Sequence, residues 1–142
     1  MDVKTAVTDE DIWRCWEVLF ALRPHLQKES FIHDVRKTLV DNRQLVFIEE
    51  EGVAVAASVF EWGYNLYRGD YIYIDDLTTL PQARKKGYAG KLVDWIFDYA
   101  KKNGFQQVHL DSGANPGRYD AHRLYLKKGF NITSFHFATP VK

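Results

Sequence analysis

Residues 84–90, which read R-K-K-G-Y-A-G, combine three basic side chains with two glycines between a strand-like and a helix-like segment. The first N–H groups of a helix have no partner within the helix, and the helix dipole makes that end positive. A glycine lets the backbone approach a ligand closely, because it has no Cβ. Such a loop can hold a phosphate group. The sequence therefore predicts a ligand that carries a pyrophosphate, with an exposed basic turn as the alternative.

Two common phosphate-binding motifs do not fit this loop. A P-loop requires G-x-x-x-x-G-K-[ST], but Gly90 and Lys91 are followed by Leu92, and no glycine stands five positions before Gly90. A Rossmann fingerprint requires G-x-G-x-x-G, whereas the loop contains only Gly87 and Gly90. The preceding segments also indicate a meander of strands rather than a βαβ unit. We therefore do not expect an ATP- or NAD-binding enzyme.

Three carboxylates stand in strand-like segments just before the loop. Asp75 and Asp76 end the run Y-I-Y-I-D-D, and Glu61 lies in the segment before it. Acidic side chains in such a setting suggest a functional site, either as a base or as partners of a cationic ligand. The five histidines form no H-x-x-x-H or H-E-x-x-H pair and the chain has one cysteine. We therefore expect no metal site.

The hydrophobic pattern predicts which elements position these residues, in the order β-α-α-β-β-β-α-β-α-β. Thr8 is typical of an N-cap, because acidic residues follow it in the first turn. Strands are expected over residues 3–7, 44–49, 53–62, 70–79, 107–111 and 130–137, and helices from Thr8 to Pro24, from Ser30, over 89–102 and over 118–128. We find no repeat or linker. The order describes a single mixed α/β domain over residues 1–142.

The composition is typical of a globular protein. The chain has 142 residues, of which 46% are hydrophobic and 27% are charged, and this length can bury a sizeable core. No apolar run approaches the roughly 18 residues that span a membrane, and the N-terminus lacks the layout of a signal peptide. We therefore expect a soluble, cytoplasmic protein without a membrane partner.

The net charge is zero, but it is unevenly distributed. Residues 1–80 carry 8 Lys and Arg against 15 Asp and Glu, whereas residues 81–142 carry 11 against 4. The basic half suits an anionic ligand and the acidic half a cationic one. An unevenly charged solvated surface is the alternative. Because no basic stripe is present, we expect no nucleic-acid partner.

Two sequence blocks carry a resemblance to a known family. Arg84, Gly87 and Ala89 fit R-x-x-G-x-A, and here the chain resembles the GNAT superfamily of N-acetyltransferases, whose cofactor loop reads [QR]-x-x-G-x-[GA]. Residues 121–130 resemble the family's A-x-x-x-Y-x-x-x-G-F ending. With the order of elements, the resemblance covers nearly the whole chain. Residues 81–84 and 120–123 are also similar to the aminoalkylphosphonate acetyltransferases within this family.

The resemblance implies an acyl-CoA N-acyltransferase fold with acetyl-CoA as the donor. Backbone amides of residues 85–90 are expected to hold the pyrophosphate, and Lys85 or Lys86 to reach the 3′-phosphate. Residues 77–79 are expected to carry a bulge that opens the sheet toward residues 107–111, so that the pantetheine arm pairs with the strand edge. An amide there would polarise the thioester carbonyl. The implied cofactor contacts are Leu77, Thr78, Thr79, Arg84, Lys85, Lys86, Gly87, Tyr88, Ala89, Gly90, Asn115 and Tyr125.

The resemblance also implies catalytic roles. Tyr125 stands four residues before Gly129, at the place of the family tyrosine that protonates the departing CoA thiolate. A core tyrosine with a surface hydroxyl is the alternative, and a plain turn residue is the alternative for Asn115. Asp76 matches a frequently acidic position and is the expected base. Residues expected to border the acceptor are Glu61, Trp62 and Asp75.

The expected reaction is direct attack of a small primary amine on the thioester within a ternary complex. An amine of a protein or peptide is an alternative acceptor, and a non-catalytic acyl-CoA-binding sensor is an alternative function. We expect acceptor specificity to lie in the first two helices and in the loop at residues 64–69. The aromatic strand expected over residues 130–137 could form the edge of a homodimer.

Overall fold

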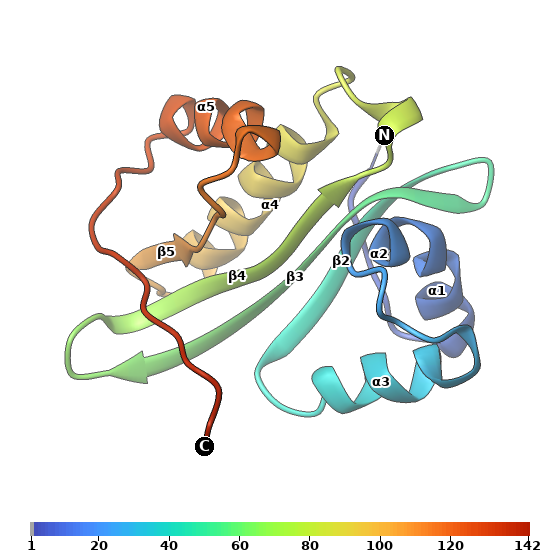
Figure 1. The fold of residues 1–142 in the computed structure, drawn as a ribbon, viewed down its shortest axis with the longest axis horizontal. Coiled ribbons are helices and arrows are strands. Elements are labelled where there is room, and N and C mark those ends of the chain that lie inside the picture. The colour runs from blue at the N-terminus through green and yellow to red at the C-terminus, as the bar shows by residue number, and fades with distance from the viewer. Residues whose placement is uncertain (1) are drawn as a thin grey trace. The chain divides into compact units, whose positions relative to one another are not determined.

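The computed structural model describes residues 2–142. The chain divides into two compact units, one that ends at Leu110 and one that comprises Asp111–Lys142. The first unit contains a five-stranded sheet with α1, α2 and α3 on one face and α4 on the other (Figure 1). No helix within residues 2–142 is long and apolar enough to cross a membrane.

The sheet is mixed, and its strand order follows the sequence. Its strands are β1 (Lys4–Thr5), β2 (Arg43–Glu50), β3 (Val53–Asn65), β4 (Gly69–Thr79) and β5 (Gln107–Leu110). Neighbours from β1 to β4 are antiparallel, and β4 and β5 are parallel. A parallel pair needs a crossover, which α4 (Tyr88–Lys102) supplies. The mixed α/β fold class is confirmed.

The first predicted helix is present, but it is broken. Instead of one helix, the chain forms α1 (Asp9–Arg14) and α2 (Trp16–Leu22), separated at Cys15. The Cys15 N–H donates to the Ile12 carbonyl only three residues earlier, at 2.9 Å, which tightens the turn and interrupts the α-helical pattern. Cys15 is fully buried, so the break is held by packing that the sequence pattern does not reveal.

Thr8 is the N-cap of α1, as its sequence context predicts. Its side chain accepts the N–H of Asp11 at 3.1 Å, and the Asp11 carboxylate accepts the N–H of Thr8 at 3.1 Å. This reciprocal arrangement satisfies two otherwise unpaired donors. The hydrogen bonds from the backbone of Val7 and Thr8 lower the pKa of Asp11. The remaining elements of this region are the 3-10 turn η1 (Lys28–Ser30) and α3 (Phe31–Thr38).

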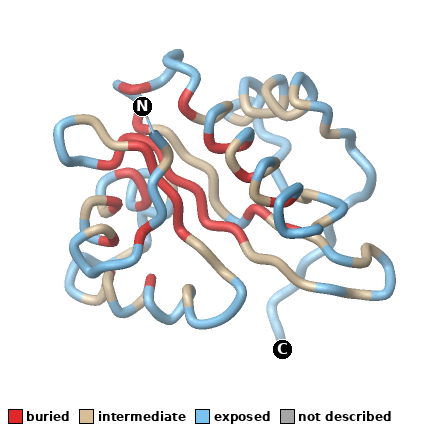
Figure 2. The backbone as a smooth tube through the Cα atoms, turned by 180° about the vertical axis from the view of Figure 1, so that it is seen from behind, coloured by how far each residue is buried: buried red, intermediate tan, exposed pale blue. Residues whose placement is uncertain are grey.

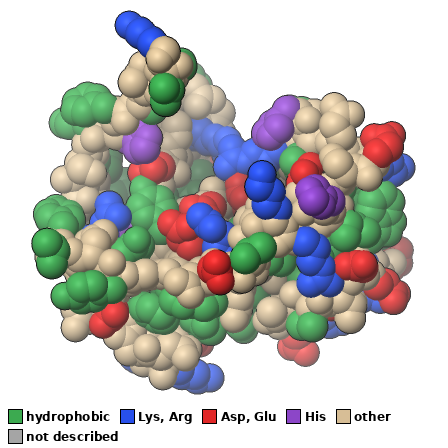
Figure 3. All heavy atoms as spheres, turned by 90° about the horizontal axis from the view of Figure 1, so that it is seen from below, with side chains coloured by type: hydrophobic (Ala, Val, Ile, Leu, Met, Phe, Trp, Pro, Cys, Tyr) green, Lys and Arg blue, Asp and Glu red, His purple; other side chains and the backbone are tan. Residues whose placement is uncertain are grey.

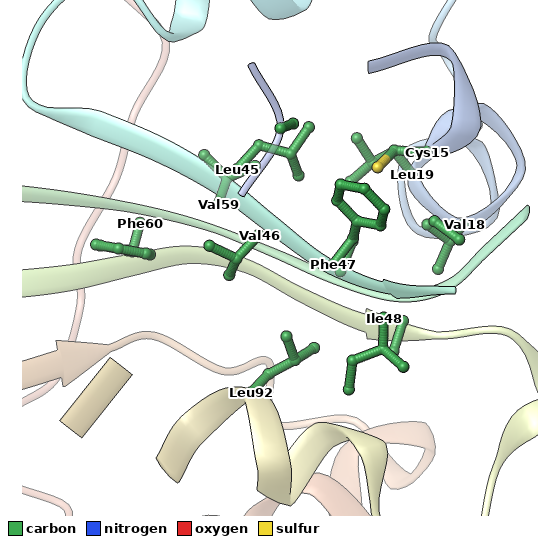
Figure 4. Close-up of a cluster of buried hydrophobic side chains, with 14 of the residues drawn as sticks. Cys15, Val18, Leu19, Leu45, Val46, Phe47, Ile48, Val59, Phe60 and Leu92 are labelled. Atoms are coloured by element: carbon green, nitrogen blue, oxygen red, sulfur yellow. The ribbon is translucent and has the colours of Figure 1, made fainter. Parts of the chain in front are cut away.

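The core lies on both faces of β2 and β3 (Figure 2). Alternate side chains of β2 point to opposite sides, with Leu45 and Phe47 toward α2 and with Val46 and Ile48 toward Leu92 of α4 (Figure 4). Strands that are covered on both faces read as continuous hydrophobic runs. This is why the sequence pattern located β2 and β3 well.

The second unit contains the turn η3 (Pro116–Arg118) and α5 (Tyr119–Lys127). The strand predicted over residues 130–137 is wrong, because this segment belongs to none of the ladders within residues 2–142. Ile132, Phe135 and Phe137 are exposed. Alternating apolar residues indicate only a local preference for extended backbone. A strand forms only where a neighbouring segment pairs with that backbone.

Candidate functional site

The ladder between β3 and β4 contains one irregularity. Val59 pairs with Asp76, whereas Phe60 pairs with Ile74, so Asp75 is an extra residue in β4. Such a bulge bends its strand and re-aims the side chains around it. The sequence predicts the bulge within residues 77–79, but these residues pair in regular order with residues 56–58. A bulge is therefore present in β4, immediately before the predicted segment.

β4 extends well beyond its parallel neighbour. β5 pairs with residues 71–74 of β4 and ends at Leu110. From Asp75 to Thr79, the β5-facing edge of β4 has no strand partner among residues 2–142. An open strand edge can pair with an extended ligand as it would with another strand. The pairing of β4 with β5 therefore ends just before residues 77–79, where the sequence predicts a bound pantetheine arm.

The loop before α4 has an unusual backbone. It follows the turn η2 (Pro81–Ala83), and both Lys85 and Gly87 adopt left-handed conformations, with φ of 66° and 80°. Gly87 is the N-cap of α4, and no side chain within residues 2–142 caps this helix end. Left-handed residues in such loops turn backbone N–H groups toward a common anion site. The backbone thus fits the predicted pyrophosphate site, which stays a prediction.

Glu50, at the end of β2, holds two residues of this region. Its Oε2 lies 3.0 Å from the Lys86 ammonium and accepts the Tyr88 hydroxyl at 2.8 Å. The Tyr88 bond, followed by Lys86, lowers the pKa of Glu50, and Glu50 raises the pKa of Lys86 and of Tyr88. Lys85 has no such partner among residues 2–142. Of the two lysines predicted to reach the 3′-phosphate, Lys85 is the one with an uncommitted ammonium.

Arg84 and Thr79, both predicted cofactor contacts, lie together. The Arg84 Nε donates to the Thr79 carbonyl oxygen at 3.4 Å, which is long for a hydrogen bond. This contact connects the loop before α4 to the end of β4. The loop and the open strand edge therefore adjoin one another within the first unit.

Asp76 is held by an arginine that sequence analysis did not identify. The Nε of Arg23, at the end of α2, donates to Asp76 Oδ1 at 2.8 Å, and the Arg23 guanidinium also donates to the Asp75 carbonyl at 3.2 Å. These hydrogen bonds connect the bulge to the end of α2, on the face of the sheet that α1, α2 and α3 cover. Because Arg23 lies 53 positions before Asp76, only the fold shows this partnership.

Asp75 lies in a second charged cluster with Glu61 and Arg43. Arg43 forms an ion pair with Glu61, and its Nε lies 3.5 Å from Asp75 Oδ2. Burial, followed by repulsion from Glu61, raises the pKa of Asp75, and the attraction of Arg43 only partly offsets these effects. Acidic and basic side chains lie intermixed on the face shown in Figure 3. The pKa of Asp75 is therefore raised above the ordinary value of an aspartate.

Trp62 does not join this cluster. Successive strand residues point to opposite faces, and the Trp62 ring packs 5.9 Å from Tyr99 and 6.4 Å from Phe105. It therefore belongs to the core beside α4, away from Glu61. Of the three residues expected to border the acceptor, the structure brings together only Glu61 and Asp75.

Tyr125 and Asn115 belong to the second unit. The Tyr125 ring is partly buried and makes an edge contact with Phe130 at 5.9 Å. Burial raises the pKa of Tyr125, and Arg118 opposes this shift. A tyrosine with a raised pKa keeps its proton at neutral pH, as a general acid must. Asn115 precedes η3, and its carbonyl accepts the Arg118 N–H at 2.9 Å.

Comparisons with known proteins agree with these features. The family model described as Acetyltransferase (GNAT) family matches residues 7–130. An uncharacterized N-acetyltransferase, YhdJ of Bacillus subtilis, is 31% identical over 138 residues, which cover 95% of this chain and 96% of that protein. The aminoalkylphosphonate N-acetyltransferase of Salmonella typhimurium is 26% identical over 118 residues, which cover 82% and 75%.

A solved structure supports the fold. A putative acetyltransferase from Agrobacterium tumefaciens superposes with a TM-score of 0.82 at 22% identity, over 98% of this chain and 100% of that one. At this identity the likeness concerns the fold. The family match over most of the chain shows more: the protein belongs to the GNAT family of N-acetyltransferases, whose donor is acetyl-CoA.

Proposed function

We propose that the protein transfers the acetyl group of acetyl-CoA to the primary amine of a small molecule, by direct attack within a ternary complex. The observation that carries this proposal is the open edge of β4 beside the bulge at Asp75. A donor arm paired with that edge would place its thioester near Asp75 and Asp76. Such a position is required if an amine bound at these carboxylates is to attack directly.

The donor contacts follow from the backbone around the open edge. The pantetheine arm pairs with residues 77–79, and the N–H groups of residues 85–90 bind the pyrophosphate. Lys85 binds the 3′-phosphate, because the Lys86 ammonium is engaged by Glu50. Support comes from the left-handed Lys85 and Gly87 and from the uncapped start of α4 within the described chain.

The general base in this proposal is Asp75 rather than Asp76. A base must accept a proton from the acceptor ammonium, and a carboxylate with a raised pKa does so more readily at a given pH. Asp75 has such a raised pKa, whereas Oδ1 of Asp76 already accepts two hydrogen bonds from the Arg23 guanidinium. Asp76 then serves to bind the cationic acceptor. Tyr125 is the acid that protonates the departing thiolate.

A small amine is the favoured acceptor for two reasons, the negative charge of the site and the name of a relative. Carboxylates outnumber arginines among Asp75, Asp76, Glu61, Arg23 and Arg43, which favours a cation. The Salmonella relative, by its name, acts on an aminoalkylphosphonate, which is also a small amine. We further propose that the two compact units act as one domain, since the family match spans both.

The proposal is tested by measuring release of free CoA with a panel of amines. We expect release with small primary amines and none with their N,N-dimethyl counterparts, which bind as cations but lack a transferable N–H. Mass spectrometry should find one N-acetyl product for each CoA released. Tight binding of acetyl-CoA without turnover of any amine would instead favour a non-catalytic acyl-CoA sensor.

A further inference from the structure

A small pocket lies between α2, α3 and the strands β3 and β4, on the face of the sheet that α1, α2 and α3 cover. Its volume is about 100 Å³. Apolar side chains form most of its wall, among them Leu19, Phe31, Val35 and Val59. Leu19, Phe31 and Val59 are nearly or fully buried, so side chains of the core form the floor of this space. An apolar wall of this kind favours an aliphatic group.

The rim of the pocket is polar and carries more negative than positive charge. Asp34, Asp76 and Arg23 contribute to it. Arg23 binds one oxygen of Asp76, and the other oxygen, Oδ2, has no hydrogen-bond partner among residues 2–142. Asp34 Oδ2 accepts the Ser30 hydroxyl at 3.0 Å. The rim therefore offers an unused carboxylate oxygen to a cation whose apolar part enters the pocket.

The pocket also adjoins the open edge of β4. Val59, in its wall, pairs with Asp76, at its rim. Asp76 in turn stands between the bulge residue Asp75 and Leu77, the first residue of the segment proposed to pair with the donor arm. An ammonium at Asp76 is thus one residue from the proposed base and one from the proposed position of the donor arm.

We propose that this pocket binds the apolar portion of the acceptor, and that the acceptor is a primary alkylamine with a short aliphatic group. A water molecule occupies about 30 Å³, so the pocket accommodates roughly three to four non-hydrogen atoms. Heavily hydroxylated amines would lose their hydration against the apolar wall and are disfavoured. This inference rests on the proposed function, since it assigns the acceptor of the same transfer reaction.

A homologous series of unbranched primary amines, from ethylamine to octylamine, tests the size of the pocket. We expect kcat/KM to rise about fourfold for each added methylene that the pocket buries. The rise should stop at about four carbons, because longer chains exceed the volume. Equal kcat/KM across the series would overturn the inference.

Two substitutions at Val35 separate this pocket from other apolar surfaces. Val35→Ala enlarges the pocket and should move the optimum to longer amines, whereas Val35→Leu fills it and should move the optimum to shorter ones. Ile32→Val, on the same helix but outside the pocket lining, is the control and should leave the optimum unchanged. Thermal melting checks that each variant is folded.

The outcomes distinguish the inference from the proposed function. Turnover of amines with an optimum that neither Val35 variant moves contradicts only the pocket assignment. Failure to acetylate any amine while acetyl-CoA binds contradicts the proposed function, and the pocket assignment with it. An optimum that moves in opposite directions in the two variants supports both.

Discussion

Asp75 and Asp76 are neighbours in sequence but differ in what surrounds their carboxyl groups. Asp76 is bound by Arg23, and Asp75 is partly buried beside Glu61 and Arg43. If Asp75 is the base, Asp75→Asn should lower kcat by about 10²-fold or more. Asp76→Asn should mainly raise KM for the amine, because it removes a binding charge. Steady-state kinetics with a primary amine checks both variants, and an equal loss of kcat in the two would contradict the assignment.

The raised pKa of Asp75 predicts where activity is lost in acid. The base works only when it is deprotonated, so the acid limb of kcat/KM should lie above 3.8, the usual pKa of an aspartate. Glu61→Gln removes a like charge and should shift this limb to lower pH. Glu29 is exposed and is not among the charged groups that shift the pKa of Asp75, so Glu29→Gln is the control that should leave the limb in place. A raised pKa also means that Asp75 favours the folded state below its unfolded pKa and that this contribution is lost as the pH rises through its folded value.

Tyr125 is the proposed acid for protonation of the departing thiolate. Tyr125→Phe removes the hydroxyl and keeps the ring contact with Phe130. Turnover should fall by about 10²-fold, while the Kd of acetyl-CoA, measured by calorimetry, should stay nearly the same. Unchanged turnover in this variant would remove Tyr125 from the mechanism.

Whether a candidate site residue could be predicted from the sequence depends on how far away its partners lie in the chain. Gly87 and Tyr125 could be named as candidates because they stand within contiguous motifs. Arg23 and Arg43 were not, because their partners Asp76 and Asp75 lie more than 30 positions away. Their roles depend on the packing of α2 and β2 against β4, which no local pattern encodes.

At the level of elements, the loop before α4 places two adjacent lysines, Lys85 and Lys86, in different environments. Lys85→Ala should weaken binding of CoA by about two- to fivefold, as expected for one exposed charge pair. It should have little effect on 3′-dephospho-CoA, which lacks the phosphate that Lys85 is proposed to bind. Lys86→Ala is the matched control, since Glu50 already engages that ammonium. A larger loss in Lys86→Ala than in Lys85→Ala would reverse the assignment.

The N-terminus of α1 is stabilised by its capping box. Thr8→Ala removes the acceptor for the Asp11 N–H and should lower the free energy of unfolding by about 1 kcal/mol. Thr8→Ser keeps the hydroxyl and is the control. Hydrogen bonds lower the pKa of Asp11 in the folded state. The Asp11 carboxylate therefore stabilises the fold above its unfolded pKa, and this stabilisation is lost as the pH falls through its folded pKa. Thermal melts at neutral and acidic pH measure the difference, and equal melting of the Ala and Ser variants would contradict it.

Elements whose signals are local were predicted well, and those that depend on partners were not. The cap at Thr8, the hairpin of β3 and β4 and the start of α4 follow from caps, turns and periodicity. The break at Cys15 and the missing strand at residues 130–137 depend on tertiary packing and on pairing. The position of the bulge likewise depends on the register between two strands rather than on the residues of one.

At the scale of the whole molecule, the uneven charge of the chain parallels the two substrates. The acidic residues of the first half include the Asp75, Asp76 and Glu61 carboxylates, and the basic second half includes the loop at residues 84–86. We therefore propose that a cationic amine and an anionic donor bind at adjoining parts of the first unit. If both are bound together, transfer needs no acetylated intermediate on the protein.

The most direct test is to measure initial rates of CoA release while acetyl-CoA is varied at several fixed concentrations of a small primary amine. Direct attack within a ternary complex predicts double-reciprocal lines that intersect, and the intact mass of the protein should show no added acetyl group after incubation with acetyl-CoA alone. Parallel lines with an acetylated protein, or no amine-dependent release at all, would contradict the account.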